Sequence, residues 1–146
     1  NQFRKDEGVT LEKEFLHRIA NIINLMNQAL AYDAERVETV KTRLRTALDE
    51  LKENVDENRF EQELIFYLEK YDITEEKVRL ESHLNYFIET LAGSEANGRK
   101  LGFITQEMGR EINTMGSKSN HSEMQKLVVM MKDELEKIKE QVLNVL

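Results

Sequence analysis

Apolar residues recur every three or four positions through most of the chain, which is the spacing of one face of an α-helix. The first stripe follows Thr10, a residue type that often caps the start of a helix, and it predicts a helix from about Thr10 to Leu30. Its apolar positions are Leu11, Phe15, Ile19, Ile23, Met26 and Leu30.

A second stripe begins after Tyr32 and predicts another helix, with Asp33 either breaking or only bending one long rod. Its apolar positions are Val37, Val40, Leu44, Leu48, Leu51 and Val55. A polar connector at Asp56–Asn58 then leads into a short third helix that ends near Tyr71. The apolar positions of that helix are Phe60, Leu64, Tyr67 and Leu68.

Thr74 is the expected cap of a fourth helix, with Glu75 and Glu76 in the first turn, where the helix dipole favours acids. The expected core face of this helix is Val78, Leu84, Phe87 and Leu91. The turn residues of Gly93–Gly98 predict a loop.

A fifth helix follows this loop and ends within Gly116–Asn120, with Leu101, Ile104, Met108, Ile112 and Met115 as its expected buried side. The sixth runs to the C-terminus, with an apolar seam at Val128, Met131, Leu135, Ile138, Val142 and Val145. This seam has a heptad rhythm, which fits a helix packed within its own bundle or one at a contact between subunits.

Composition agrees with long helices, because the 146 residues contain no proline where average usage of about 5% would give roughly seven. We therefore predict an all-α fold, a bundle of about six helices that includes long antiparallel ones. The absence of cysteine excludes disulfides and thiolate metal sites. No apolar run has the length of a membrane span and no leader pattern is present, so we expect a soluble, cytoplasmic protein.

Charge singles out the segment Gly98–Ser119. It carries four cations against two acids in a chain of formal net charge −7, so its own +2 leaves −9 for the other residues. The four cations are Arg99, Lys100, Arg110 and Lys118. Because the rest of the chain is acidic, this basic and amide-rich segment is where an anionic partner is expected to bind.

Glu107 and Glu111 lie four residues apart on one helix face, so their carboxylates could hold a divalent cation between them. The alternative is structural, since Glu107 can also pair with Arg110 three residues away. On the fourth helix Glu76, Arg79 and His83 share one line, which would bring together an acid, an anion clamp and a proton carrier. A surface or capping role is the alternative for His83.

Other candidates carry less chemistry. Glu14 and His17 form a single Glu-x-x-His pair, whereas a di-iron bundle needs two such pairs. The methionines sit mostly on apolar faces and are expected to pack rather than to ligate. Three tyrosines could stack on bases, although helix packing is the more ordinary role: Tyr67, Tyr71 and Tyr86.

Several blocks of sequence resemble the YicC/YloC family of bacterial endoribonucleases, also known as stress-induced proteins. The blocks of the fifth helix are Gly98-Arg99-Lys100-Leu101, Gln106-Glu107-Met108, Arg110-Glu111-Ile112-Asn113-Thr114 and Ser117-Lys118-Ser119. Further matches are Arg59 with Glu63, the run from Asp72 through Glu76 to Leu84, and the ending Glu136–Val142. The resemblance is strong over residues 59–146 and looser from Asp6 to Leu51.

The resemblance implies a division into residues 1–56, a helical hairpin or connector, and residues 57–146, a C-terminal helical domain. The N-terminal domain of the family is expected to be absent from this chain. The function implied is that of a metal-dependent endoribonuclease that uses Mn or Mg and acts as a homo-oligomer, a hexamer in the full-length family. An oligomerisation and RNA-clamping module without catalysis of its own is the alternative, in which case this chain alone would be inactive.

Chemistry and resemblance together assign three sets of residues. The expected catalytic groups are Glu107, Glu111 and His83. The expected RNA contacts are Arg79, Arg99, Lys100, Arg110, Asn113 and Lys118. The expected metal ligands are Asp72, Glu76, Glu107 and Glu111. Two glycines depart from the family pattern, Gly102 where Asp is usual and Gly109 where Asn is frequent, and both would permit close approach of a backbone or a ligand.

Overall fold

The computed structural model describes residues 2–50, 56–93, 98–119 and 121–144, and all regular structure in these ranges is helical. This confirms the predicted all-α fold. The helices are α1 (Gln2–Ala31), α2 (Asp33–Glu50), α3 (Glu57–Lys70), α4 (Thr74–Ala92), α5 (Gly98–Lys118) and α6 (Ser122–Val142).

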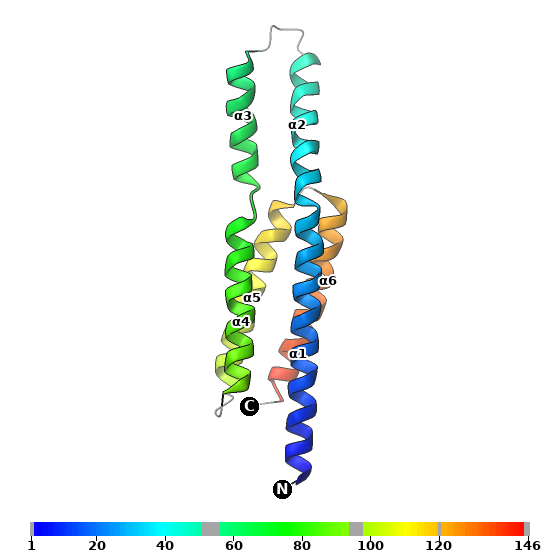
Figure 1. Cartoon of the computed structure of the whole chain (residues 1–146), viewed down its shortest axis with the longest axis vertical. Coiled ribbons are helices and arrows are strands. Elements are labelled where there is room, and N and C mark those ends of the chain that lie inside the picture. The colour runs from blue at the N-terminus through cyan, green and yellow to red at the C-terminus, as the bar shows by residue number, and fades with distance from the viewer. Residues whose placement is uncertain (1, 51–55, 94–97, 120, 145–146) are drawn as a thin grey trace.

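The helices form two parts, a four-helix bundle and a two-helix hairpin (Figure 1). Around the bundle, α1 packs against α6, α6 against α5, α5 against α4, and α4 against α1. Helix α1 continues beyond the bundle as α2, and α3 runs back into α4, so α2 and α3 pair as a projecting hairpin (Figure 1). The bundle therefore combines helices from both sides of the boundary expected near residue 56.

The bend between α1 and α2 is a single residue, Tyr32. Its backbone N–H donates to Ala29 at 3.1 Å, and its carbonyl accepts from the backbone of Arg36 at 2.9 Å. Asp33 accepts from the Arg36 guanidinium at 2.9 Å. Hydrogen bonding thus crosses the bend, and the two helices form one bent rod.

The break between α3 and α4 is fixed by Asp72 rather than by Thr74, which was the expected cap. The Asp72 carboxylate accepts from the backbone N–H of Thr74 at 3.0 Å and from its hydroxyl at 2.6 Å. These hydrogen bonds lower the pKa of Asp72, with further help from the charges of Arg36 and Lys118. An aspartate two residues before a helix start often makes such a turn, and here it takes the hydroxyl that we expected to cap.

The core lies inside the bundle, where all four helices contribute. Phe15 of α1 meets Phe87 of α4 edge-to-face, with ring centroids 5.4 Å apart. The predicted buried side of α5 is confirmed in full, and that of α6 as far as Val142. The α6 seam is therefore covered within its own chain. The predicted positions Leu51, Val55 and Val145 lie outside the described residues.

Two further predictions about the helices were wrong. Helix α1 begins at Gln2, not at Thr10, because the polar lead is rich in residues of high helix propensity. On α4, Leu84 and Phe87 are buried as predicted, but Val78 is exposed and Leu80 is completely buried instead, because Leu80 lies one turn before Leu84 on the same face and Val78 does not.

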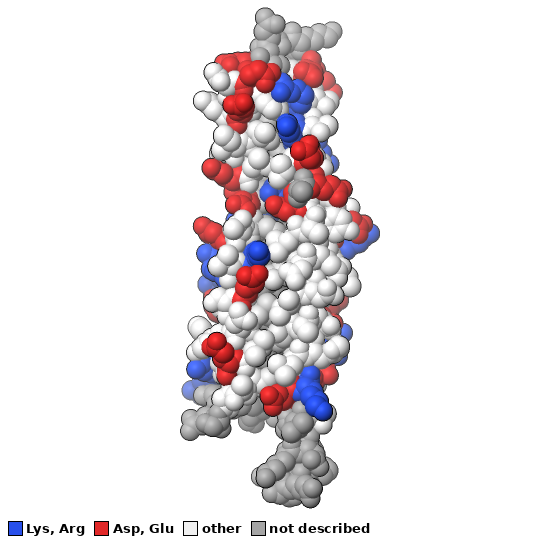
Figure 2. Space-filling view, viewed as in Figure 1, with Lys and Arg blue, Asp and Glu red and all other residues white. Residues whose placement is uncertain are grey.

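Charged side chains are unevenly distributed over the face that α1 and α4 present (Figure 2). Acidic and basic groups gather on the hairpin, whereas uncharged atoms cover most of the bundle on this side. Residues 19–32 of α1 contain no charged side chain, which accounts for much of this surface. Among the described residues, no helix has a stretch long and apolar enough to cross a lipid bilayer.

Candidate nucleic-acid interface

A buried ion pair joins the end of α5 to the start of α4. The ammonium of Lys118 donates to Glu76 at 2.7 Å and to the backbone carbonyl of Asp72 at 3.0 Å. Glu76 is only 2% exposed, and its second carboxylate oxygen has no hydrogen-bond partner. Lys118, expected to contact RNA, is therefore engaged inside the protein, where it neutralises a buried carboxylate.

A second ion pair lies one turn along the same seam. The Arg79 guanidinium donates to Glu111 at 3.0 Å and approaches Glu75 at 3.5 Å and Glu76 at 3.8 Å. The hydrogen bond to Glu111 raises the pKa of Arg79. Glu111 is buried, whereas the Arg79 side chain is half exposed. The sequence placed these groups on helix faces, and the structure shows that the two faces meet.

The four acids expected to bind a metal ion do not form a ready site. Within the described ranges, no three His, Asp or Glu side chains converge as metal ligands would. Asp72 holds the turn before α4, Glu76 and Glu111 are neutralised by cations, and Glu107 lies 3.6 Å from Arg110. Donors already paired with cations or hydroxyls are a poor fit for a hard divalent ion.

Glu107 and His83 are the most accessible of the expected catalytic groups. Helices α4 and α5 run antiparallel, and Arg79 bonds to Glu111. His83 lies one turn after Arg79 on α4, and Glu107 lies one turn before Glu111 on α5. Because the helices are antiparallel, these two residues lie at the same level of the seam. Both are partly exposed, in contrast to Glu111.

The exposed side of α5 carries no acid. Its exposed residues are Arg99, Lys100, Phe103, Gln106, Arg110, Asn113 and Ser117, while Glu107 is half-buried and Glu111 buried. We define the α5 ridge as the residues of this set that follow one another at intervals of four and three. They are Arg99, Phe103, Gln106, Arg110, Asn113 and Ser117. The ridge thus combines two guanidinium groups, two amides, a hydroxyl and an aromatic ring on one line.

Sequence reasoning missed Phe103 and Gln106. Phe103 is 63% exposed, although the expected stacking groups were tyrosines elsewhere. Tyr67 and Tyr71 stack on each other in the hairpin, and Tyr86 lies under the Lys100 ammonium, 4.9 Å from the ring centroid. The sequence did contain a signal for them, because Phe103 and Gln106 lie at helical spacing between Arg99 and Arg110 and so share their face.

Three glycines let α6 pack closely on α5. A Cβ atom at Gly116 would lie 3.0 Å from Val128, at Gly109 3.3 Å from Leu135, and at Gly102 3.8 Å from Val142. At Gly109 the close neighbour is a side chain, not the backbone or ligand that we expected, and a contact of 3.3 Å is tighter than most real side chains make. At Gly102 the distance of 3.8 Å is an ordinary contact.

The remaining candidates have structural roles. Glu14 bonds to Arg18 at 3.0 Å, and Arg18 also reaches Glu134 on α6 at 3.2 Å. Met124 and Met131 are buried in the core, as expected. His121 caps α6 through its Nδ1 atom, which accepts from the backbone N–H of Glu123 at 3.2 Å.

Comparison with known proteins supports the resemblance seen in the sequence. Residues 29–146 match the family described as endoribonuclease YicC-like, C-terminal. A probable endoribonuclease YicC of Clostridioides difficile is 38% identical over 147 residues, which cover 99% of this chain and 50% of that protein. Its counterpart in Haemophilus influenzae is 36% identical over 104 residues, covering 71% of this chain and 36% of that protein.

The chain spans about half the length of the first of these relatives and a smaller share of the second. The family match includes all of α2 to α6, and therefore both the α4–α5 ion pairs and the α5 ridge. The chain belongs to the YicC-like endoribonuclease C-terminal family.

Proposed function

We propose that this chain binds RNA along the α5 ridge and contributes groups to the cleavage of phosphodiester bonds. The observation that carries the proposal is the acid-free exposed side of α5 in a protein of formal net charge −7. A negatively charged backbone would be repelled from most of such a surface and attracted to this one.

The ridge and its neighbours supply two kinds of contact. Arg99 and Arg110 can hold phosphates through paired N–H groups, and Asn113 can hydrogen-bond to sugar or base. On the α4 side of the ridge, Lys100 lies over Tyr86 and extends the positive surface, whereas Arg79 is paired with Glu111 and would contact RNA through its exposed part. Lys118 and Glu76 do not contact RNA in this proposal. Their ion pair holds α5 against α4 and so fixes the place of the ridge.

His83 and Glu107 are the proposed proton-handling groups. One would take a proton from the attacking hydroxyl, either a ribose 2′-OH or water, as that oxygen bonds to phosphorus. The other would give a proton to the departing 5′ oxygen as its bond to phosphorus breaks. Their shared level on the α4–α5 seam, beside Arg110, supports this pairing. Glu111 would then orient Arg79 rather than react itself.

Metal dependence, implied by the family resemblance, is a separate proposal. Because the four acids are already paired, we route no step through a metal ion. The homo-oligomer that the resemblance implies is likewise proposed, and light scattering on the purified chain measures it.

Binding is tested by replacing both Arg99 and Arg110 with alanine. We expect weaker binding of a single-stranded RNA, and a log–log salt slope smaller by about 1.4, since each lost phosphate contact removes about 0.7. The matched control replaces Lys41 and Arg43, two exposed cations of α2. Equal losses from the two double variants would show that the α5 ridge has no special part.

Cleavage is tested with Glu107→Gln and His83→Asn, with the C. difficile relative as a positive control for the assay. We expect each variant to lose cleavage while keeping RNA affinity, since neither side chain is placed on a phosphate. Chelation with EDTA in the same assay measures metal dependence. If the chain binds RNA but never cleaves it, the alternative of a non-catalytic clamping module is favoured.

A further inference from the structure

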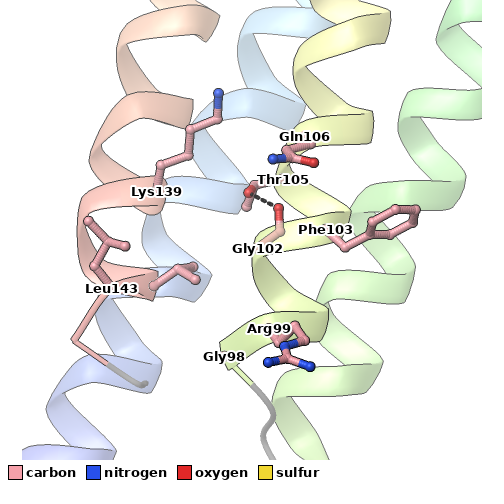
Figure 3. Close-up of a pocket in the computed structure, with 9 residues that line it drawn as sticks. Gly98, Arg99, Gly102, Phe103, Thr105, Gln106, Lys139 and Leu143 are labelled. Carbon is pink, nitrogen blue, oxygen red and sulfur yellow. Dashed lines mark hydrogen bonds between the residues drawn. The ribbon is translucent and has the colours of Figure 1, made fainter.

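A pocket of about 450 Å³ opens between the first turns of α5 and the last turns of α6 (Figure 3). Residues from both helices line it, including Arg99, Gly102, Gln106, Lys139, Val142 and Leu143. Its volume lies within the range of about 300–1,000 Å³ found for small-molecule sites. Among the described residues that line it, Arg99 and Lys139 are the charged ones.

Gly102 lines this pocket opposite Val142. A Cβ atom at this position would make an ordinary contact with Val142, at 3.8 Å, and the glycine itself leaves backbone atoms and the apolar side chain of Val142 facing the space. The Gly102 carbonyl already accepts a hydrogen bond from the Thr105 hydroxyl at 2.6 Å (Figure 3). The inner surface between the helices is therefore mostly apolar, and its carbonyl group at Gly102 already has a hydrogen-bond partner.

The rim of the pocket is polar and belongs to the α5 ridge. Arg99 and Gln106 are members of both, and both are exposed. A side-chain amide offers a donor and an acceptor together, which suits the edge of a nucleobase. Arg99 offers a cation two turns before Gln106 on α5, and the aliphatic part of Lys139 lines the α6 side of the pocket (Figure 3).

We propose that this pocket receives one unpaired base of RNA bound along the α5 ridge. This inference rests on the proposed function and names its substrate class, which is single-stranded RNA. The flat base lies over Gly102 and Val142, Gln106 bonds to its edge, and Arg99 holds the adjoining phosphate. A base within a duplex is stacked on both faces and paired at its edge, so it cannot enter.

Phe103 also lines the pocket, but its ring turns outward. The ring is 63% exposed, and Figure 3 shows it directed away from α6. It is therefore placed to stack on the next base along the strand. Stacking on aromatic side chains tolerates any base, so this contact adds affinity without sequence preference.

The decisive variant is Gly102→Leu, which fills the pocket without changing any charge. We expect it to weaken binding of an oligouridylate roughly tenfold, the scale of one lost base contact. Ala20→Leu is the control, because it adds the same kind of side chain at an exposed position of α1, and it should bind as wild type does. Gln106→Ala provides the same test if Gly102→Leu does not fold, with circular dichroism as the check.

A second comparison asks whether the base itself is recognised. An abasic ribose-phosphate chain of equal length should bind the wild type more weakly than oligouridylate does, and Gly102→Leu should reduce that preference. Phe103→Ala should also weaken oligouridylate binding. Phe66→Ala, which removes a ring of similar exposure on α3, should have no effect.

The outcomes separate the two proposals. If Gly102→Leu and Gln106→Ala bind oligouridylate as wild type does, while the Arg99 and Arg110 double variant is weakened, the base pocket is overturned and the RNA-binding ridge stands. If the wild-type chain binds no RNA, both are overturned. Stronger binding to duplex than to single-stranded RNA would also overturn the pocket.

Discussion

The bundle and the hairpin are built from similar helices but are held together in different ways. In the bundle, α1, α4, α5 and α6 bury a continuous core, whereas Arg36 and Phe60 are the buried side chains among the described residues of α2 and α3. Ile65 and Phe66 of the hairpin remain more than half exposed. Since tertiary packing supplies most of the stability of protein helices, the hairpin should open more easily than the bundle.

Arg45 of α2 connects the two helices of the hairpin through contacts with Glu57 and Phe60 of α3. Its guanidinium makes two hydrogen bonds to Glu57, at 3.0 and 3.2 Å, and lies 3.8 Å above the ring centroid of Phe60. The hydrogen bonds lower the pKa of Glu57 and raise that of Arg45. A pair this exposed is screened by water, so it orders the hairpin more than it stabilises it.

The largest contrast is expected from removing one buried ring in each part. Phe87→Ala should lower the free energy of unfolding by about 3–5 kcal/mol, because it leaves a cavity beside Phe15 in the core. Phe60→Ala should lower it by less than about 1 kcal/mol and mainly speed hydrogen exchange in α2 and α3. Urea denaturation and exchange mass spectrometry measure these effects. Equal losses would mean that the two parts unfold as one unit.

A smaller contrast is expected from the ion pairs. Glu76→Gln should cost about 1–3 kcal/mol, less than the 3–5 for a fully buried pair, because Lys118 retains 29% exposure to water. Glu57→Gln in the hairpin should change the midpoint of urea unfolding little. The comparison would fail if Glu57→Gln were the more damaging of the two.

The smallest expected effect is on the pH dependence of stability, and the carboxyl group concerned lies in the bundle. Burial raises the pKa of Glu134, but hydrogen bonds from Asn21 and Arg18 outweigh burial, and its pKa is lowered overall. A lowered folded pKa, as in Asp72 also, gives stability that is present at neutral pH and is lost as pH falls through that folded value.

Melting temperatures measured between pH 7 and pH 3 test this. We expect stability to decline below about pH 4.5, the ordinary range of carboxyl groups, and Glu134→Gln to flatten that decline. Glu63→Gln, on an exposed position of α3, is the control and should leave the pH profile unchanged. An unaltered pH profile for Glu134→Gln would show that this carboxyl group does not contribute to the loss of stability at low pH.

Sequence predicted the fold well where a strong periodicity runs through a whole helix. All five apolar positions chosen on α5 are buried. The misplaced caps at Thr10 and Thr74 were errors of local chemistry, because the hydrogen bonds that end a helix depend on a few neighbouring groups. Val78 was wrong for a different reason, because it lies off the helix face that Leu80, Leu84 and Phe87 share.

The candidate site was less predictable because its pairs are distant in the chain. Arg79 and Glu111 are 32 positions apart, and Glu76 and Lys118 are 42 apart. Helical spacing placed each on a face but could not show which faces meet. Lys118 was therefore expected to contact RNA, although it is held by a buried acid. The resemblance to a family located the segment, and packing shows that Lys118 is held by a buried acid whereas the side chains of Arg99 and Arg110 are exposed.

Three of the four glycines of α5, Gly102, Gly109 and Gly116, bear on how the chain avoids folding wrongly. They recur every seven residues, and so do the α6 residues that they face, Val128, Leu135 and Val142. A slip of α6 along α5 by seven residues, about 10.5 Å, would restore two of the three close contacts.

The turn between the two helices removes this ambiguity. The Gln125 amide donates to the carbonyls of Gly116 and Ser119, each at 2.6 Å, and the Ser119 hydroxyl donates to Met115 at 2.7 Å. A slipped pairing would break the bond from Gln125 to Gly116 and leave both groups without this partner. The glycines thus allow close packing, while a few hydrogen bonds at one end decide which of two nearly equivalent alignments the chain adopts.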